Sequence, residues 1–375
     1  MILDEMMLKS GEQALFDLRA LYQRYGYTQY KMSKFEEYDL YVKNKDFLVS
    51  DGVITFNDTD GKLLALKPDV TLSIIKNTKD EENGTQKVYY NENVYRISQN
   101  THTFKEIMQT GLECIGELDL YSMTEVTLLA IKSLEAVSEN YMLDLSHLGV
   151  LSALSDMLPM DESDKKKIIR CIGEKNPHGV REICENAGVE NAVCEKFISL
   201  IAAYGKPSEV FPKLYALGLG EDAEKALSEL EMIATTLEKI GYAGRLNIDF
   251  SVVNDMNYYS GIVFRGFIDG IPDGILSGGR YDKLMKKMGR TSGAIGFAVY
   301  LDMLELLDHT QKEYDTDILL LYNDEVDTTE LMKAVAVLAK SGNRILAQKE
   351  MPEAIRYRQL LAYRNGGLEI LEIGH

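Results

Sequence analysis

Tryptophan is absent from this chain of 375 residues, basic residues are outnumbered by acidic ones, and there are only four cysteines. The cysteines include no CxxC pair and have no histidine at metal-ligand spacing, which argues against a zinc site. No apolar run approaches the length of a membrane span, and the first residues carry acids where a secretory signal needs a basic region. These absences predict a cytoplasmic protein with reduced cysteines and no metal.

The formal net charge of −18 bears directly on possible partners. A nucleic-acid-binding surface must neutralise phosphates, so a strongly acidic chain needs a local basic patch to bind RNA. The best candidate combines Arg356, Arg358 and Arg364 with Tyr357 and Tyr363, but the solvated face of a helix explains these residues equally well. We therefore expect no nucleic-acid partner.

What the chain does contain is an ordinary globular composition, with 45% hydrophobic and 27% charged residues. The length predicts two or three domains. Apolar spacing predicts a helix over 12–25 that ends at Gly26, a hairpin over 53–57 and 62–67, and a helix over 69–77. Further β-type runs are expected over 46–50, 87–97 and 107–117, followed by a helix over 122–139.

Beyond residue 146 the pattern changes to helical signals interrupted by Gly, Pro and Asn, and strand-like runs return after residue 245. After residue 310 we expect alternating strands and helices, with the second helix over 352–364. The fold class predicted is α+β: an antiparallel sheet with flanking helices, a helical insertion and a small C-terminal α/β domain. The expected segments are 1–146 and 245–310 for the sheet domain, 147–244 for the insertion and 311–375 for the C-terminal domain.

Three stretches carry polar side chains in patterns that point to a ligand. In the first, Asp69 and Thr71 lie within one turn of a helix start, where Asp69 can bind an ammonium group or simply cap the helix. In the second, Gln109, Gly111 and Glu113 alternate along a strand and therefore share one face. That face suits a small polar ligand, although a solvent-facing strand surface explains it too.

The third stretch runs from Tyr258 and Tyr259 through a glycine-rich region to Ser277-Gly-Gly-Arg-Tyr-Asp282. Glycines at this density inside strands mark places where a ligand or another backbone approaches closely. At the junction of strand and helix, we expect Arg280 and free N–H groups to point at the ligand.

In this order and spacing the stretches resemble class II histidyl-tRNA synthetases, over residues 12–308. The family's R-P-E-G-T pattern resembles Lys67-Pro-Asp-Val-Thr71, and its motif 2 resembles Tyr95-Arg96 followed by Gln109, Gly111 and Glu113. The R-G-L-D-Y-Y signature resembles the segment ending at Tyr258 and Tyr259. The resemblance implies a class II synthetase-like core and a homodimer.

By the same resemblance, seven residues would form a histidine pocket. Asp69, Thr71 and Gln109 would hold the ammonium group, Glu113 and Tyr258 the imidazole, and Tyr259 would shape the wall. Arg96 belongs to the same motif 2 pair of strands. No cofactor or catalytic residue is implied.

Three departures from the synthetase pattern fall on the groups that handle ATP. Asn254 replaces the arginine that opens R-G-L-D-Y-Y, Met303 replaces the arginine of motif 3, and Ser98 replaces the acid of motif 2. Adenylation develops charge at a phosphate, which fixed guanidinium groups offset and Asn or Met cannot. The pocket would thus keep its amino-acid contacts and lose its ATP contacts.

The region after residue 308 is also shorter than an anticodon-binding domain. Together these features resemble the paralogous family of ATP phosphoribosyltransferase regulatory subunits. That resemblance implies a non-catalytic role, a short-form catalytic subunit as partner within a larger hetero-oligomer, and histidine as effector, bound in the old pocket or at the subunit interface. The alternatives are a divergent histidyl-tRNA synthetase or other histidine-activating ligase, an RNA-binding sensor, and a structural chain with a dead pocket.

Overall fold

The computed structural model describes residues 9–48, 52–80, 84–97, 103–253, 258–307, 314–364 and 366–373. The chain divides into two compact units that meet at residues 307 and 308, and each is described by itself. Among the described residues, no helix is long and apolar enough to cross a membrane.

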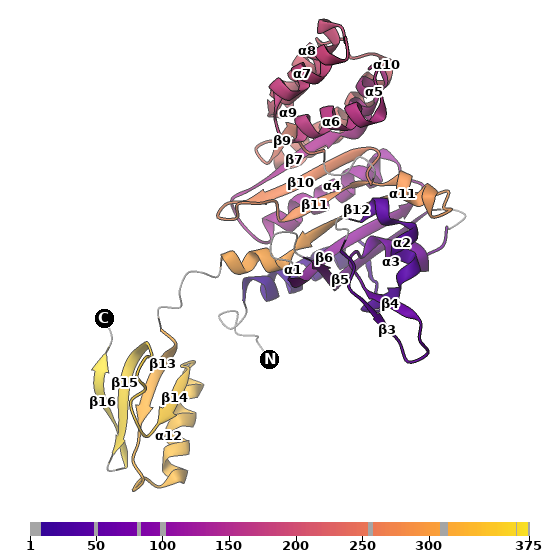
Figure 1. Ribbon diagram of the computed structural model, residues 1–375. Coiled ribbons are helices and arrows are strands. Elements are labelled where there is room, and N and C mark those ends of the chain that lie inside the picture. The colour runs from indigo at the N-terminus through magenta and orange to yellow at the C-terminus, as the bar shows by residue number, and fades with distance from the viewer. Residues whose placement is uncertain are drawn as a thin grey trace. The chain divides into compact units, whose positions relative to one another are not determined.

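The first unit is built on a nine-stranded, largely antiparallel sheet, in which, among the described strands, only β1 with β5 and β7 with β9 pair in parallel (Figure 1). From one edge to the other the strands are β1 (Thr28–Gln29), β5 (Thr85–Ile97), β6 (Phe104–Gly116), β12 (Gly293–Tyr300), β11 (Leu276–Arg280), β10 (Ile262–Ile268), β7 (Tyr141–His147), β9 (Leu246–Asp249) and β8 (Tyr204–Gly205). The central antiparallel sheet predicted from the sequence is confirmed.

One face of this sheet is covered by α1 (Ser10–Arg24) and α4 (Leu120–Glu135), which pack apolar side chains against it. The hydroxyl groups of Tyr22 in α1 and Ser133 in α4 lie 3.0 Å apart, and the Tyr22 ring packs against Phe297 of β12. On β6, Leu112 and Cys114 point into this core. The residues that alternate with them along β6 therefore point to the opposite face of the sheet, because side chains alternate along a strand.

Two smaller groups of elements flank the large sheet. A three-stranded sheet, with α2 (Tyr38–Lys43) and α3 (Thr71–Asn77) near it, has the order β2 (Phe35–Glu37), β4 (Leu63–Leu66) and β3 (Thr55–Asn57). The predicted hairpin corresponds to β3 and β4. The β-type run expected over 46–50 is wrong where it can be checked, because Lys45–Phe47 forms a 3₁₀ turn; residues 49–50 lie outside the described residues.

In the described residues six α-helices lie between β7 and β9 in the chain, interrupted only by the short edge strand β8, and Figure 1 shows them gathered beyond that edge of the sheet. They are α5 (Leu148–Asp156), α6 (Glu162–Gly173), α7 (Pro177–Asn186), α8 (Asn191–Ala202), α9 (Pro207–Tyr215) and α10 (Glu221–Leu237). The longest, α10, buries Leu227, Leu230 and Ile233 at helical spacing and packs against α5. The short helix α11 (Asp282–Lys287) and a 3₁₀ helix at Leu301–Leu306 complete the unit.

Over its described residues, the second unit is a four-stranded sheet with one helix, α12 (Thr328–Lys340). Its strand order is β14 (Ile345–Gln348), β13 (Thr316–Leu321), β15 (Tyr357–Arg364) and β16 (Gly367–Ile373). The helix predicted over 352–364 is wrong, because β15 occupies its second half. Leucine, arginine, glutamine and alanine favour a helix locally, but the position between β13 and β16 buries Leu360 to Tyr363 and overrides that preference.

Candidate ligand-binding site

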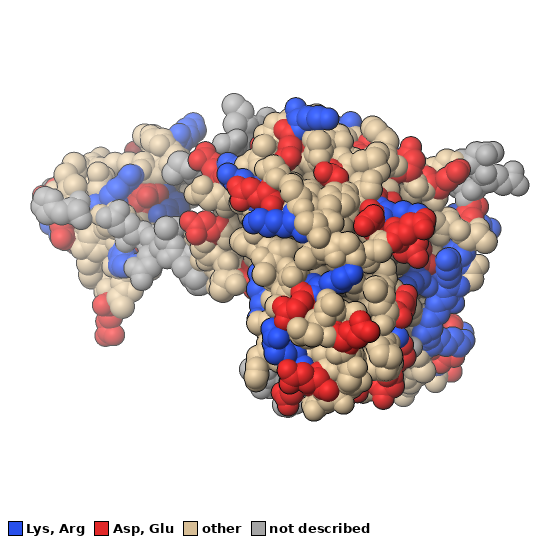
Figure 2. Space-filling model, turned by 90° about the horizontal axis from the view of Figure 1, so that it is seen from above, with Lys and Arg blue, Asp and Glu red and all other residues tan. Residues whose placement is uncertain are grey.

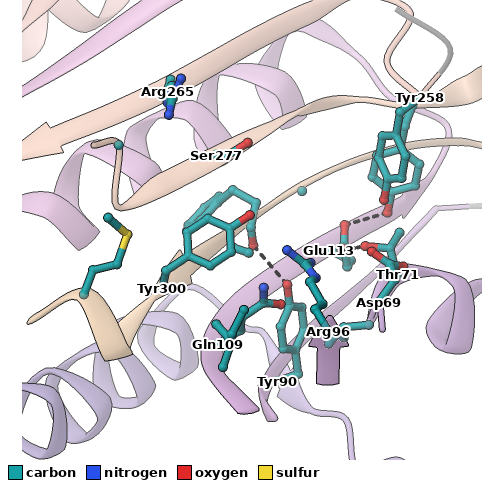
Figure 3. A pocket seen from close by; sticks show the side chains of 18 of the residues that line it. Asp69, Thr71, Tyr90, Arg96, Gln109, Glu113, Tyr258, Arg265, Ser277 and Tyr300 are labelled. Carbon is teal, nitrogen blue, oxygen red and sulfur yellow. Dashed lines mark hydrogen bonds between the residues drawn. The ribbon is translucent and has the colours of Figure 1, made fainter. Parts of the chain in front are cut away.

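A cavity of about 430 Å³ lies on the face of the nine-stranded sheet opposite to α1 and α4. It is lined by all seven residues predicted for a ligand pocket, which are Asp69, Thr71, Arg96, Gln109, Glu113, Tyr258 and Tyr259 (Figure 3). They come from four parts of the chain: the start of α3, β5, β6 and the segment before β10. The solvent-facing alternative for Gln109 and Glu113 is wrong, since these side chains are only 3% and 2% exposed.

The floor of the cavity is made by small residues that stand in register across the central strands. Ser277 pairs with Ala298, which pairs with Gly111. In the adjacent row Gly296 pairs with Glu113, and a Cβ atom added to Gly296 would lie 1.8 Å from Oε2 of Glu113. The glycine is therefore required for the carboxylate to occupy its place, and the hollow exists because large side chains are missing from the middle of the sheet.

Glu113 is the most deeply placed carboxyl group of the cavity. Thr71 Oγ1 donates to Oε1 at 2.8 Å and the Tyr281 hydroxyl donates to Oε2 at 2.5 Å. Burial raises the pKa of Glu113 to about 8, against the lowering effect of the two hydroxyl donors, and the nearby Asp69 charge adds to the rise. Among the described residues no Lys or Arg forms an ion pair with Glu113. A ligand cation would supply that missing charge.

Asp69 has a structural role and also faces the cavity. Its Oδ1 accepts the Leu72 N–H at 2.9 Å, which is the helix-cap contact considered from the sequence. Burial raises the pKa of Asp69, opposed by the Leu72 hydrogen bond and by the charge of Arg96. The carboxyl group therefore stabilises the start of α3 and adds a second acid to the same end of the cavity as Glu113.

Arg96 and Gln109 lie on the neighbouring strands β5 and β6. The Arg96 Nε donates to the Pro68 carbonyl at 3.1 Å, which connects β5 to the segment just before α3. Gln109 is buried and pairs in register with Tyr300 of β12. An amide and a guanidinium are thus held at the cavity by backbone elements of the sheet.

Tyrosine rings form one wall of the cavity. The ring centroid of Tyr258 lies 4.7 Å from that of Tyr259 and 5.7 Å from that of Tyr281. Burial raises the pKa of all three hydroxyl groups, so they remain neutral at physiological pH. They can therefore donate or accept hydrogen bonds without adding charge.

Several lining residues were not predicted from the sequence, namely Tyr90, Arg265, Tyr300 and Asp302, while Ser277 and Tyr281 belong to the third stretch but were given no place in the pocket. For Arg265 a signal was available, because it is the lone charge in the otherwise apolar strand Ile262–Ile268. For Tyr90 and Tyr300 none was, because only the strand register, Tyr90 with Gly111 and Tyr300 with Gln109, brings them to the cavity.

The expectation that Arg280 points at the ligand is wrong. Arg280 does not line the cavity; its Nε donates to Asp282 at 2.9 Å and its Nη1 lies 3.6 Å from the sulfur of Met123 in α4. The reason is strand alternation, which places Ser277 and Gly279 on the cavity face and Arg280 on the face of α4.

Of the three departures from the synthetase pattern, only Met303 can be located. Its side chain lines the cavity, so a thioether stands where the synthetase pattern has a guanidinium. Asn254 and Ser98 lie outside the described residues. In the described part of the chain there is no group of three or more His, Cys, Asp or Glu side chains placed to hold a metal ion.

Comparison with known proteins agrees with this architecture. The family model of histidyl-tRNA synthetase matches residues 3–304. The crystal structure of an ATP phosphoribosyltransferase regulatory subunit/histidyl-tRNA synthetase from Bacillus halodurans superposes with a TM-score of 0.74 at 23% identity, covering 94% of this chain and 93% of that one. An ATP phosphoribosyl transferase complex from Thermotoga maritima contains a chain similar in fold, with a TM-score of 0.62 at 16% identity, covering 80% of this chain and 98% of that one.

Curated relatives extend the similarity to the sequence itself. The ATP phosphoribosyltransferase regulatory subunit of Clostridium kluyveri is 31% identical over 319 residues, 82% of this chain and 81% of that protein. The regulatory subunit of Alkaliphilus metalliredigens is 26% identical and matches 100% of this chain and 99% of its own length. Because the similarity spans both units, this chain belongs to the family of ATP phosphoribosyltransferase regulatory subunits.

Proposed function

We propose that this chain is the non-catalytic regulatory subunit that assembles with a short-form catalytic subunit of ATP phosphoribosyltransferase. In this role it is required for the first step of histidine biosynthesis and for feedback inhibition by histidine. The observation that carries the proposal is the similarity to curated regulatory subunits over four-fifths or more of both chains.

The cavity supports histidine as the effector. Asp69 and Glu113 are buried carboxyl groups that gain from a cation nearby, and an amino acid with an imidazole side chain brings an ammonium group and a second group that can carry positive charge. In the proposed arrangement Asp69, Thr71 and Gln109 face the ammonium group, Glu113 and Tyr258 face the imidazole, and Tyr259 forms the wall. Arg96 is the seventh residue of the proposed pocket.

The absence of catalysis is proposed on chemical grounds. Formation of an adenylate requires positive charge fixed where the phosphate develops negative charge, and removal of one such donor typically costs on the order of a hundredfold or more in rate. In this cavity the motif 3 position is Met303, a thioether that supplies no positive charge. We therefore expect no histidine-dependent activation of ATP.

Regulation requires that histidine bind two states of the assembly with different affinity. We propose that docking of this chain favours the active state of the catalytic subunit, whereas histidine favours an inhibited state. A homodimer of this chain within a larger hetero-oligomer, and a cytoplasmic location, complete the proposal.

Nucleic acid is not part of the proposal. The candidate basic residues of the C-terminal unit have polar or acidic neighbours: Arg356 pairs with Asp315 at 2.9 Å and Arg358 donates to the Asn343 amide oxygen. On the face of the molecule shown in Figure 2, acidic and basic side chains are interspersed. With a net charge of −18, such a surface does not favour a polyphosphate backbone.

The deciding experiment measures phosphoribosyl transfer by the short-form catalytic subunit of the same organism, with and without this chain, across a histidine titration. We expect the chain to raise activity and to confer inhibition by histidine. If it does neither, the regulatory proposal is wrong.

A divergent histidyl-tRNA synthetase, or another histidine-activating ligase, is the second candidate, favoured by the family match over residues 3–304. Histidine-dependent exchange between pyrophosphate and ATP separates the two, because the ligase must catalyse it and the regulatory subunit must not. Both assays are made with the same protein preparation, so that activity in one assay shows that a negative result in the other is not caused by misfolded protein.

A further inference from the structure

The cavity is electrically polarised along its length. One end carries the carboxyl groups of Asp69 and Glu113, and the other carries the guanidinium of Arg265 together with its ion-pair partner Asp273; Asp302 also lines the cavity. Figure 3 shows Arg265 well separated from Asp69, Thr71 and Glu113. A free amino acid has the complementary polarity, with positive charge at one end and a carboxylate at the other.

Strand register places Arg265 across the central strands from Glu113. Arg265 of β10 is in register with Ser277, then Ala298, then Gly111 of β6. Three strand spacings separate Arg265 from the strand that carries Glu113, which is about 14 Å between backbones. Glu113 lies two residues beyond Gly111 on the same face, so a ligand that contacts both groups lies across the central strands, and the long Arg265 side chain provides part of the reach.

The ion-pair partner of Arg265, Asp273, can be replaced by a ligand carboxylate at little cost in free energy. The guanidinium is ion-paired with Asp273, whose side chain is 67% exposed, and exposed ion pairs contribute little free energy. Gly274 lets the backbone next to Asp273 come close to Arg265, because a Cβ atom at this position would lie 2.4 Å from Nε of Arg265. On the far side, Asp144 of β7 is the in-register neighbour of Arg265; burial raises its pKa to about 6, opposed by a hydrogen bond from Asn247 and by the charge of Arg265.

The other arginine of the cavity is placed differently. Arg96 lies near Asp69, whose pKa its charge lowers, and its Nε is committed to the Pro68 carbonyl. Its charge is therefore partly balanced at the acidic end. Arg265 is the guanidinium at the opposite end of the described cavity.

On this basis, and resting on the proposed function, we propose that Arg265 binds the α-carboxylate of the effector, which takes the place of the Asp273 carboxylate. A guanidinium binds a carboxylate through two parallel hydrogen bonds, so the contact is specific for the carboxylate group. The site then selects amino acids and rejects the corresponding amines and amino alcohols. In this arrangement β10, the strand that carries Arg265, provides the contact with the carboxyl end of the ligand.

The test compares two ligands on the full-length chain by isothermal titration calorimetry: histidine, and histidinol, in which a hydroxymethyl group replaces the carboxylate. We expect the wild-type chain to prefer histidine by at least tenfold. Arg265→Met should weaken histidine by about tenfold to a hundredfold and leave histidinol within about threefold, because one charge-assisted contact is removed. Arg265→Lys should keep part of the preference.

Two further variants separate this assignment from a structural role. Asp273→Asn removes the competing carboxylate and should keep or tighten histidine binding; equal weakening of histidine by Asp273→Asn and Arg265→Met would show that the ion pair only supports the fold. Loss of the preference in Arg96→Met, with Arg265→Met still discriminating, would assign the carboxylate to Arg96 and overturn the inference.

The outcomes also distinguish this inference from the proposed function. If the wild-type chain binds no histidine, alone or with the catalytic subunit, the effector role in this cavity fails and the inference fails with it. If histidine binds and regulates but Arg265→Met keeps the preference for the carboxylate, only the inference fails. Thermal unfolding of each variant confirms that folded protein is compared.

Discussion

The nine-stranded and the four-stranded sheets of this molecule are packed in opposite ways. In the nine-stranded sheet, small residues such as Gly111, Ser277 and Gly296 occupy one face of the central strands and leave a hollow with carboxyl groups in it. In the four-stranded sheet the central face under α12 is filled by Ile318, Leu320, Leu361 and Tyr363. The difference shows that a ligand cavity in a sheet depends on which side chains are omitted as much as on which are present.

The largest expected effect is a dependence of first-unit stability on pH through Glu113. Its pKa in the folded state, about 8, lies above the ordinary value of 4.5. The protonated Glu113 therefore contributes to the free energy of unfolding fully below about pH 4.5, and this contribution is lost as pH rises through 8. At about 1.4 kcal/mol per pH unit, the loss has an upper limit of roughly 5 kcal/mol. Calorimetric unfolding from pH 5 to 9 measures this loss.

The matched variants for this prediction are Glu113→Gln and Glu117→Gln. The first replaces the buried carboxyl group by an uncharged amide and should flatten the pH dependence between 5 and 9. Glu117 is exposed just beyond β6, and its variant should retain the wild-type dependence. An unchanged slope in Glu113→Gln would contradict the burial argument.

Next in size is Leu320→Ala in the four-stranded sheet. Leu320 is fully buried, and such a truncation typically costs about 2–5 kcal/mol. Because Leu320 belongs to the core of the second unit, we expect its unfolding transition to move to lower temperature and histidine affinity to stay within about twofold. An equal shift in both transitions would show that the two units unfold as one.

Gly296→Ala should have a smaller effect on stability but a decisive one on binding. The added methyl group would meet Oε2 of Glu113 at 1.8 Å and the Leu112 carbonyl at 2.4 Å. Overpacking of this kind costs about 1–3 kcal/mol, and displacement of Glu113 should abolish histidine binding. Gly367→Ala is the control, because a Cβ atom there meets nothing within 4 Å.

The smallest effect concerns pH in the second unit, where the sign is reversed. Hydrogen bonds from Arg344 lower the pKa of Asp317, so the stability that this carboxylate provides is present above its ordinary pKa and is lost as pH falls. We expect Asp317→Asn to reduce the stability of the second unit at pH 7 by less than about 1 kcal/mol. The difference should vanish in strong acid.

The sequence was sufficient for the parts of the site that follow from local pattern. Alternation along β6 puts Gln109, Gly111 and Glu113 on one face, and Asp69 stands at a helix start, as the structure confirms. It was insufficient where partners are distant, as for Tyr281 and Glu113, which are 168 positions apart. Only strand register brings such residues together.

Local pattern also misled where the environment overrode it. The segment over 352–364 has the residues of a helix, yet β15 lies between two strands that supply its hydrogen bonds. Strand β7 was missed because the helical texture that begins at His147 obscured a short strand, Tyr141–His147, that is buried along nearly all its length.

The parallel pairing of β7 with β9 has a consequence for folding kinetics. The Asn247 side chain donates to Asp144 across 103 positions of the chain, and closing a flexible loop of that length costs about 4 kcal/mol of entropy. The intervening segment contains α5 and α10, which pack against each other near its two ends. If these helices form first, the ends are already close when β9 meets β7, so the rate of sheet completion depends on the helices rather than on random closure.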